Sequence, residues 1–337
     1  MQKGARMGLV YHYSSPQGAL GILQNKSFWF TDCEFMNDPA ELAYSYELYD
    51  RAWVEVCREF GVPETQIERE ITRFANPYEC RAEISDALGI DIPARYYALS
   101  TCSNGDDAAM WANYAIKGGR AGYALALDGE SLTQALEQLA SEAPGFGFYV
   151  EVIYGQVQYI EGKQLENIKS AIKVHLERLA EASDSSDELD RFLCSEIART
   201  DHWGWFGDVA PFIKRPEFAY EQEYRFVLKV TQLESEQKAI VAPNKNTVSE
   251  QTGPCGCSDC PVPTASPISP HFREGFAGAI TPYFEVGLGD AFADVLRAIR
   301  GNSFHNAPFV KEGIARLVKG SGLKDVSVEM SDVLLRG

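Results

Sequence analysis

The sequence predicts an α+β fold with a mixed or antiparallel central sheet and large helical excursions. Short runs rich in aromatic and β-branched residues occur early, in the middle and late in the chain, which is typical of strands. Amphipathic stretches lie between them without the regular strand–helix alternation that builds a parallel sheet. No internal repeat of solenoid period is present.

The first half of the chain begins with two expected strands on either side of a short helix. Ser15 and Pro16 provide a helix start, and Asp38-Pro39 provides a second one. The expected elements are a strand at 8–15, a helix at 16–25, a strand at 27–32, a helical region from 37 to about 92, a strand at 94–103, a short helix at 106–118, a strand at 120–128 and a helix at 131–143.

The second half contains a long helical region between strands. The expected elements are a strand at 148–160, helix over about 164–200, a strand within 212–230, a strand at 279–289, a helix at 290–301 and a last strand at 326–330. Residues 243–270 are rich in Pro, Ser, Thr and Gly, so we interpret them as a Cys-rich surface insertion. We expect a single domain formed by 1–242 and 271–337.

Composition indicates a folded, acidic protein. The chain has 337 residues, a hydrophobic fraction of 45% and a formal net charge of −17. This charge argues against non-specific nucleic-acid binding, which needs a Lys/Arg surface. The absence of an apolar run near 18 residues and of a signal peptide predicts a cytoplasmic protein that does not enter the membrane. Eight scattered cysteines fit reduced thiols.

The insertion carries a possible metal site. Cys255, Cys257 and Cys260 resemble a zinc knuckle with one ligand missing, and His271 follows eleven residues after the last of them. A turn-rich segment with few apolar residues would be stabilised by such a metal. We therefore expect a structural zinc ion if these four residues meet.

Glu221, Glu223 and Arg225 alternate in "AYEQEYRFVLKV", so on a strand all three would share one face. Two neighbouring carboxylates perturb each other's pKa values and suit orienting a hydroxyl or stabilising a cationic transition state. The alternative is a solvated strand face in which Arg225 pairs with one glutamate.

Other candidate residues lie near predicted strand ends. His12 is suited to hydrogen-bonding a ribose hydroxyl; the alternative is a half-buried histidine bound to backbone carbonyls. Ser100 and Thr101 suit helix capping or ligand binding. Trp111 and Tyr114 share a helix face, where they either join the core or lie against a flat heterocycle. The phosphate-loop, H-E-x-x-H and G-x-S-x-G motifs are absent.

The segments "YHYSS", "ILQNKSFWFTDCEFMNDPAE", "STCSNGDDAAMWANYA", "GYALALD", "FAYEQEYRFV" and "VSVEMSDVLLRG" resemble a bacterial family, domain of unknown function 2971. These segments occur in order over nearly the whole chain. The family name gives no activity.

A second resemblance, to the ADP-ribosyltransferase superfamily, rests on a strand-borne His, a middle hydroxyl or aromatic element and a late Glu-x-Glu. It implies a central sheet of the ADP-ribosyltransferase type and NAD as the substrate. Glu223 would be the catalytic carboxylate and Glu221 its helper. The residues implied for NAD binding are His12, Tyr13, Ser100, Thr101, Trp111, Tyr114 and Arg225.

Three functions remain open at this point. The first is an NAD-dependent ADP-ribosyltransferase of the toxin or anti-phage effector kind, acting on an unknown macromolecular acceptor and restrained by an inhibitor or partner protein. The second is a non-enzymatic ligand-sensing or interaction protein with a polar network around Arg225. The third is a nuclease that uses Asp38, Glu41, Glu221 and Glu223 around a divalent metal.

Overall fold

The structure is a computed structural model, and its described part excludes several segments. The described residues are 7–36, 41–65, 67, 94–116, 121–183, 202, 204–232, 268–275, 278–302, 307–323 and 325–333. Within this part of the chain, no helix is long and apolar enough to cross a membrane.

The chain divides into two compact units. Unit 1 comprises Met1–Asp32, Ala94–Gly155 and Glu221–Gly337, and unit 2 comprises Cys33–Pro93 and Gln156–Tyr220. The single-domain boundaries predicted from the sequence stay a prediction, as does the insertion, of which only the last three residues are described.

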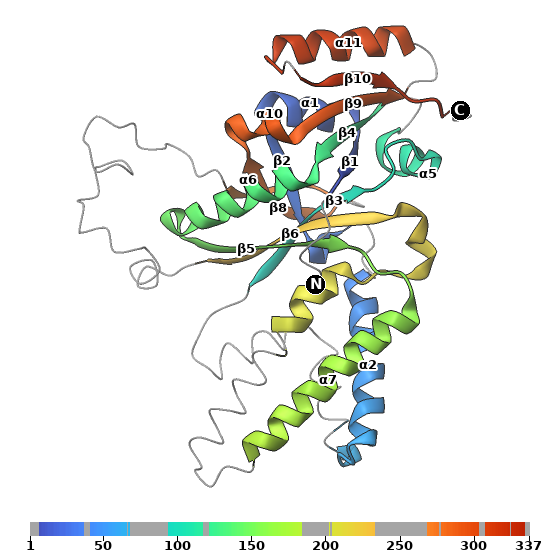
Figure 1. Cartoon of the computed structure of the whole chain (residues 1–337), viewed down its shortest axis with the longest axis vertical. Coiled ribbons are helices and arrows are strands. Elements are labelled where there is room, and N and C mark those ends of the chain that lie inside the picture. The colour runs from blue at the N-terminus through green and yellow to red at the C-terminus, as the bar shows by residue number, and fades with distance from the viewer. Residues whose placement is uncertain are drawn as a thin grey trace, which may run out of the picture. The chain divides into compact units, whose positions relative to one another are not determined.

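Unit 1 contains a ten-stranded mixed sheet (Figure 1). Its strands are β1 (Leu9–Ser14), β2 (Ser27–Asp32), β3 (Arg95–Cys102), β4 (Gly122–Asp128), β5 (Phe148–Gln156), β6 (Glu223–Gln232), β7 (Ile268–Glu274), β8 (Ile280–Gly287), β9 (Leu296–Asn302) and β10 (Ser327–Met330). The order is β10-β9-β4-β1-β3-β2-β8-β7, with β6 pairing with both β3 and β5. β9 and β10 pair in parallel, whereas β1 pairs antiparallel with β3 and β4. The predicted α+β class with a mixed sheet is confirmed.

Helices cover one face of this sheet. They are α1 (Pro16–Asn25), α6 (Gly129–Glu142), the one-turn α10 (Phe292–Val295) and α11 (Ala307–Gly320). Each of them supplies buried apolar residues to a single hydrophobic core, which the sheet completes with residues such as Phe28, Leu125, Phe226 and Phe284. Figure 1 shows α11 beside β9 and β10. Burial of this apolar surface is the main force that holds unit 1 together.

The helix predicted at 290–301 is wrong over most of its length. Only Phe292–Val295 is α-helical, and Leu296–Asn302 forms β9, which pairs antiparallel with β4. Pairing beside a buried strand overrode the helical pattern of this segment, because strand preference depends on the neighbours available. Strand β7 and helix α11 are absent from the sequence-based prediction.

Helix α1 begins as predicted. Ser15 is its N-cap, and its Oγ accepts a hydrogen bond from Gly18 N at 3.2 Å, with Pro16 at the first helical position. A hydroxyl at this position satisfies one of the amide groups that the first turn leaves without a partner.

We expect Ser15→Ala to lower the free energy of unfolding by about 1 kcal/mol, because the cap is lost while the helix stays in place. Urea unfolding followed by circular dichroism measures this change. Ser141→Ala is the control: its hydroxyl donates to Gln138 O inside α6 and caps no helix start, so we expect a change within about 0.5 kcal/mol. Equal effects of the two substitutions would contradict the capping role.

Unit 2 contains the packed helices α2 (Glu41–Glu59) and α7 (Glu161–Ser183). Their buried faces form a separate core that includes Leu48, Val56, Ile168 and Ile172. Exposed ion pairs join the same two helices outside the core, including Lys169–Glu55 and Lys173–Glu59 at 2.7 Å. The start of the predicted second helix at Asp38-Pro39 lies outside the described residues.

Candidate functional site

Strands β1 and β6, which carry the predicted residues His12 and Glu223, both pair with β3. Tyr11 in β1 lies opposite Cys102 in β3, and Cys102 lies opposite Glu223 in β6. Paired strands lie about 4.8 Å apart, so β1 and β6 are separated by roughly 10 Å at this end of the sheet. Residues more than 200 positions apart in sequence therefore meet around one end of β3.

The edge of β3 that faces β1 is shared by two strands. β2 pairs with it at Ala98 and Tyr97, and β1 pairs with it only at Cys102. Ser100 lies between these two regions, and its carbonyl is bound by His12 Nδ1 at 2.9 Å. The imidazole thus supplies a hydrogen bond where backbone pairing is interrupted.

This contact determines which ring nitrogen of His12 carries the proton. A carbonyl oxygen can only accept, so Nδ1 carries the proton and Nε2 of the neutral ring is an acceptor. Burial lowers the pKa of His12, the Ser100 contact opposes this effect, and the charge of Arg273 lowers the pKa further. A neutral histidine with an Nε2 acceptor is the form that can receive a hydrogen bond from a hydroxyl group.

The two glutamates hold different partners, and both are buried. Glu223 receives two hydrogen bonds from Arg225, Nε to Oε1 at 2.6 Å and Nη2 to Oε2 at 2.9 Å. Glu221 Oε1 accepts a hydrogen bond from the Tyr114 hydroxyl at 2.5 Å. The exposed fractions of Glu221, Glu223 and Arg225 are 3%, 3% and 1%, so the alternative is wrong in expecting a solvated face. The pairing of Arg225 with one glutamate, which the same alternative expected, is observed at Glu223.

The predicted common strand face holds only for Glu223 and Arg225. Glu221 is the last residue of a 3₁₀ helix over Pro216–Glu221, and β6 begins at Glu223. Between them Gln222 has a φ of 45°, in the left-handed region that few non-glycine residues adopt. This turn, rather than strand alternation, brings the Glu221 side chain to Tyr114.

Several other predicted site residues are used inside the protein. The Thr101 hydroxyl donates to Tyr224 O at 2.7 Å. The Tyr13 hydroxyl donates to Asn104 O and accepts from Asp107 N. Trp111 is fully buried, where its ring contacts Tyr13 edge-on and its Nε1 donates to Asp106 at 2.8 Å. Tyr13 and Trp111 are therefore structural parts of the small core beside β3, and the Thr101 hydroxyl is bound to the backbone of β6.

Register also separates the side chains by sheet face. Glu223 lies on the same face as Cys102 and Tyr11, because directly opposed residues share a face. His12 alternates with Tyr11, and its ring lies edge-on to Phe28 in the main core. His12 and Glu223 therefore project from opposite faces of the sheet.

Cys102 is a buried group at this site that the sequence-based prediction did not select. Its thiol donates to Asn104 O at 3.0 Å, and burial raises its pKa to about 12, with further upward effects from Asp107, Glu223 and Glu221. The thiol therefore stays protonated and unreactive at neutral pH. Its position in an apolar strand gave no signal that distinguished it from an ordinary core residue.

The predicted zinc ligands are described only in part. Cys255, Cys257 and Cys260 lie outside the described residues, and His271 is on β7, with its Nε2 3.7 Å from Glu285. Among the residues that the structure describes, no group of three or more His, Cys, Asp or Glu side chains is arranged to hold a metal ion. Asp38, required by the nuclease hypothesis, is outside the described part as well.

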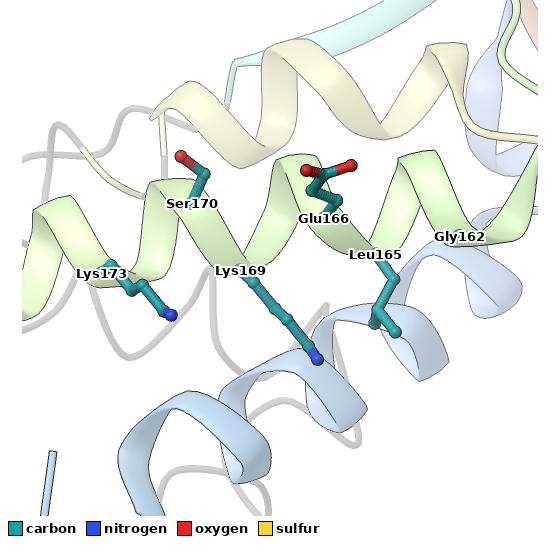
Figure 2. Close-up of a pocket in the computed structure, with 6 residues that line it drawn as sticks. All are labelled: Gly162, Leu165, Glu166, Lys169, Ser170 and Lys173. Atoms are coloured by element: carbon teal, nitrogen blue, oxygen red, sulfur yellow. The ribbon is translucent and has the colours of Figure 1, made fainter. Parts of the chain in front are cut away.

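A shallow hollow on unit 2 contains none of the predicted site residues. It lies along α7 and is lined by Gly162, Leu165, Glu166, Lys169, Ser170 and Lys173 (Figure 2). The two lysines extend toward α2, where Glu55 and Glu59 pair with them, while Glu166 and Ser170 point away on the other side of α7. The two lysines of this hollow therefore join α7 to α2.

Residues 110–226 match the family model described as "Protein of unknown function (DUF2971)". The DUF2971 match covers about a third of the chain, which is narrower than the resemblance seen in the sequence. It includes Tyr114, Glu221, Glu223 and Arg225, and it excludes His12. No curated protein and no solved structure matches the chain.

Proposed function

We propose that this protein binds NAD around the end of β3 and cleaves the bond between nicotinamide and ribose, transferring ADP-ribose to a cellular macromolecule. The observation that carries the proposal is the convergence of β1, β3 and β6, with His12 on β1, Glu223 at the start of β6 and Glu221 just before it. β1 and β6 lie about two strand spacings apart, which is within the length of one dinucleotide. Because His12 and Glu223 project from opposite faces of the sheet, the proposed NAD extends around the end of β3.

The chemistry assigns a role to each charged group. The C–N bond breaks with its electron pair leaving on nicotinamide, so positive charge develops on the ribose. A carboxylate in a fixed orientation stabilises this charge, and the two hydrogen bonds from Arg225 hold Glu223 in one orientation. An acceptor hydroxyl, guanidinium or amide then bonds to the ribose carbon and gives its proton to the second carboxylate, Glu221.

The test uses labelled NAD in a cell lysate, with free nicotinamide and labelled macromolecules measured separately. We expect nicotinamide release by the wild type, loss of release in Glu223→Gln, and wild-type release in the control Glu151→Gln. Glu151 is a half-exposed β5 carboxylate of the same unit that pairs with Lys229. Thermal melting monitored by circular dichroism establishes that each variant is folded.

A second pair of variants separates structure from ligand binding at His12. Asparagine can retain the donor that binds Ser100 O but lacks Nε2, whereas glutamine can place a polar group near Nε2. We expect His12→Asn to fold and to bind NAD more weakly than His12→Gln in calorimetry. Absence of both nicotinamide release and NAD binding by the wild-type protein would overturn the proposal.

A specific observation favours a second candidate, a non-enzymatic interaction or ligand-sensing protein. The Glu223–Arg225 pair and the Glu221–Tyr114 contact form buried polar interactions of the kind that specify a unique core. In this candidate the glutamates only maintain the structure, so Glu221→Gln and Glu223→Gln would change stability while wild-type protein releases no nicotinamide.

A further inference from the structure

A ladder of aromatic and cationic side chains lies on one face of strands β2, β8 and β7. In the antiparallel register, Thr31 in β2 opposes Tyr283 in β8, and Tyr283 opposes His271 in β7. Trp29 and Arg273 lie two residues along their strands from these positions, so alternation places all five on the same face. The opposite face carries Phe28 and Phe284 of the main core.

The members of this ladder contact one another across the strands. The rings of Trp29 and Tyr283 have centroids 4.6 Å apart, and those of His271 and Tyr283 are stacked at 5.5 Å. The Arg273 guanidinium lies 5.9 Å from the Trp29 ring centroid and 6.0 Å from that of Tyr283. Its Nη2 donates to Thr31 Oγ1 at 2.8 Å, which fixes the guanidinium in place.

Arg273 differs from most arginines in the described part of the chain. Most arginines in that part pair with a carboxylate, as Arg51, Arg225 and Arg300 do. Among the described residues, no carboxylate lies within ion-pair distance of Arg273. The neighbouring Glu285 on the same face is bound instead by Ser27 Oγ at 2.6 Å and lies 3.7 Å from His271 Nε2.

The ladder is open to solvent. Trp29 is 44% exposed, the His271 side chain is 43% exposed, and Arg273 is exposed on β7, the last strand of the sheet order. An exposed indole offers a surface on which a flat base stacks. A fixed guanidinium with free N–H groups binds phosphate oxygens, often through two hydrogen bonds.

We infer that this ladder is a nucleotide subsite in which a base stacks on Trp29 and a phosphate binds Arg273. The inference goes beyond the proposed cleavage reaction, because it requires binding alone and none of Glu221, Glu223 or His12. We assign the occupant as a free nucleotide rather than a nucleic-acid strand. The formal net charge of −17 repels a strand of many phosphates far more than a ligand with one or two.

The test measures binding of ADP to the full chain by isothermal titration calorimetry. We expect one site, with affinity reduced about 10-fold or more in Trp29→Ala and in Arg273→Gln, since loss of one stacking ring or one charged hydrogen-bond donor has effects of this size. Phe309→Ala and Arg316→Gln on the exposed surface of α11 are the matched controls, and we expect them to bind ADP within 2-fold of wild type.

Three further titrations define the ligand. Adenosine without phosphate and inorganic phosphate alone are each expected to bind more weakly than ADP, because each occupies half of the subsite. The third titration uses an oligo(dA) of eight nucleotides. If it binds more tightly than ADP, and Trp29→Ala and Arg273→Gln reduce its affinity equally, the free-nucleotide assignment is overturned and the occupant is a nucleic-acid strand.

The result is independent of catalysis. ADP binding that is retained in Glu223→Gln and lost in Arg273→Gln supports the subsite even if no nicotinamide is released. No ADP binding at millimolar concentration, or binding that neither Trp29→Ala nor Arg273→Gln weakens, would overturn the subsite.

Discussion

Arg225→Met is expected to lower the free energy of unfolding by about 3–5 kcal/mol, because it leaves the Glu223 carboxylate buried without its counter-charge. Both side chains are almost completely buried, and two hydrogen bonds join them. Loss of one member of such a pair costs more than the pair itself contributes, since the desolvation of the remaining charge is no longer offset.

A double-mutant cycle separates the pair from its surroundings. We expect Arg225→Met combined with Glu223→Gln to be more stable than Arg225→Met alone, because the uncompensated charge is removed together with its partner. Urea unfolding monitored by far-ultraviolet circular dichroism gives the four free energies.

Arg316→Met provides the matched control for this cycle. Arg316 pairs with Glu312 one turn away on the exposed surface of α11, and exposed pairs of this kind contribute less than about 1 kcal/mol. A loss in Arg225→Met no larger than that in Arg316→Met would show that Glu223 is not held as a buried charge.

Local sequence signals predicted the elements that they determine directly. The strand at 27–32 and the helix that starts at Ser15 and Pro16 form as expected, since alternation and capping act within a few residues. The segment 296–302 did not follow its helical pattern because β4 was available as a partner, and that information lies more than 160 residues away.

In the candidate site, too, local features were predictable from the sequence and contacts between distant segments were not. The sequence identified His12, Glu221 and Glu223 as unusual polar residues, and the fold places the strands of His12 and Glu223 on either side of β3. One sequence-based alternative paired Arg225 with a glutamate, and the structure shows this pair at Glu223. The sequence did not reveal that the pair is buried, or that Tyr114 reaches Glu221 through the turn at Gln222. The Arg273 ladder was missed because its members come from three strands and form no local motif.

Unit 2 is expected to lose stability in mild acid through a buried histidine. The ring of His202 is stacked on that of His175 with centroids 4.3 Å apart, and its Nε2 lies 2.6 Å from the Tyr49 hydroxyl. Burial is the main cause that lowers the pKa of His202 to about 3 from the ordinary value of 6.5, and the neighbouring His175 lowers it further. The folded state therefore holds this ring neutral.

The direction of the pH effect follows from the difference between the pKa of His202 in the folded state and its ordinary value in the unfolded chain. Above pH 6.5 the ring is neutral in both states, so the full stability is present; as the pH falls toward 3, only the unfolded chain gains the proton. At pH 5 the resulting loss is about 2 kcal/mol. The fluorescence of Trp53 and Trp205, which lie in the same cluster, reports urea unfolding of this unit at pH 7.5 and pH 5.

His202→Gln is expected to remove most of this pH dependence, because the amide does not titrate and can still accept from Tyr49. His271→Gln is the control, since that histidine is exposed on β7 of unit 1 and its substitution leaves the cluster around His202 intact. Equal loss of stability between pH 7.5 and pH 5 in wild type and His202→Gln would contradict the assignment of acid sensitivity to His202. If the pH dependence disappears in His202→Gln and persists in His271→Gln, the stacked histidine pair is the group that limits the stability of unit 2 in acid.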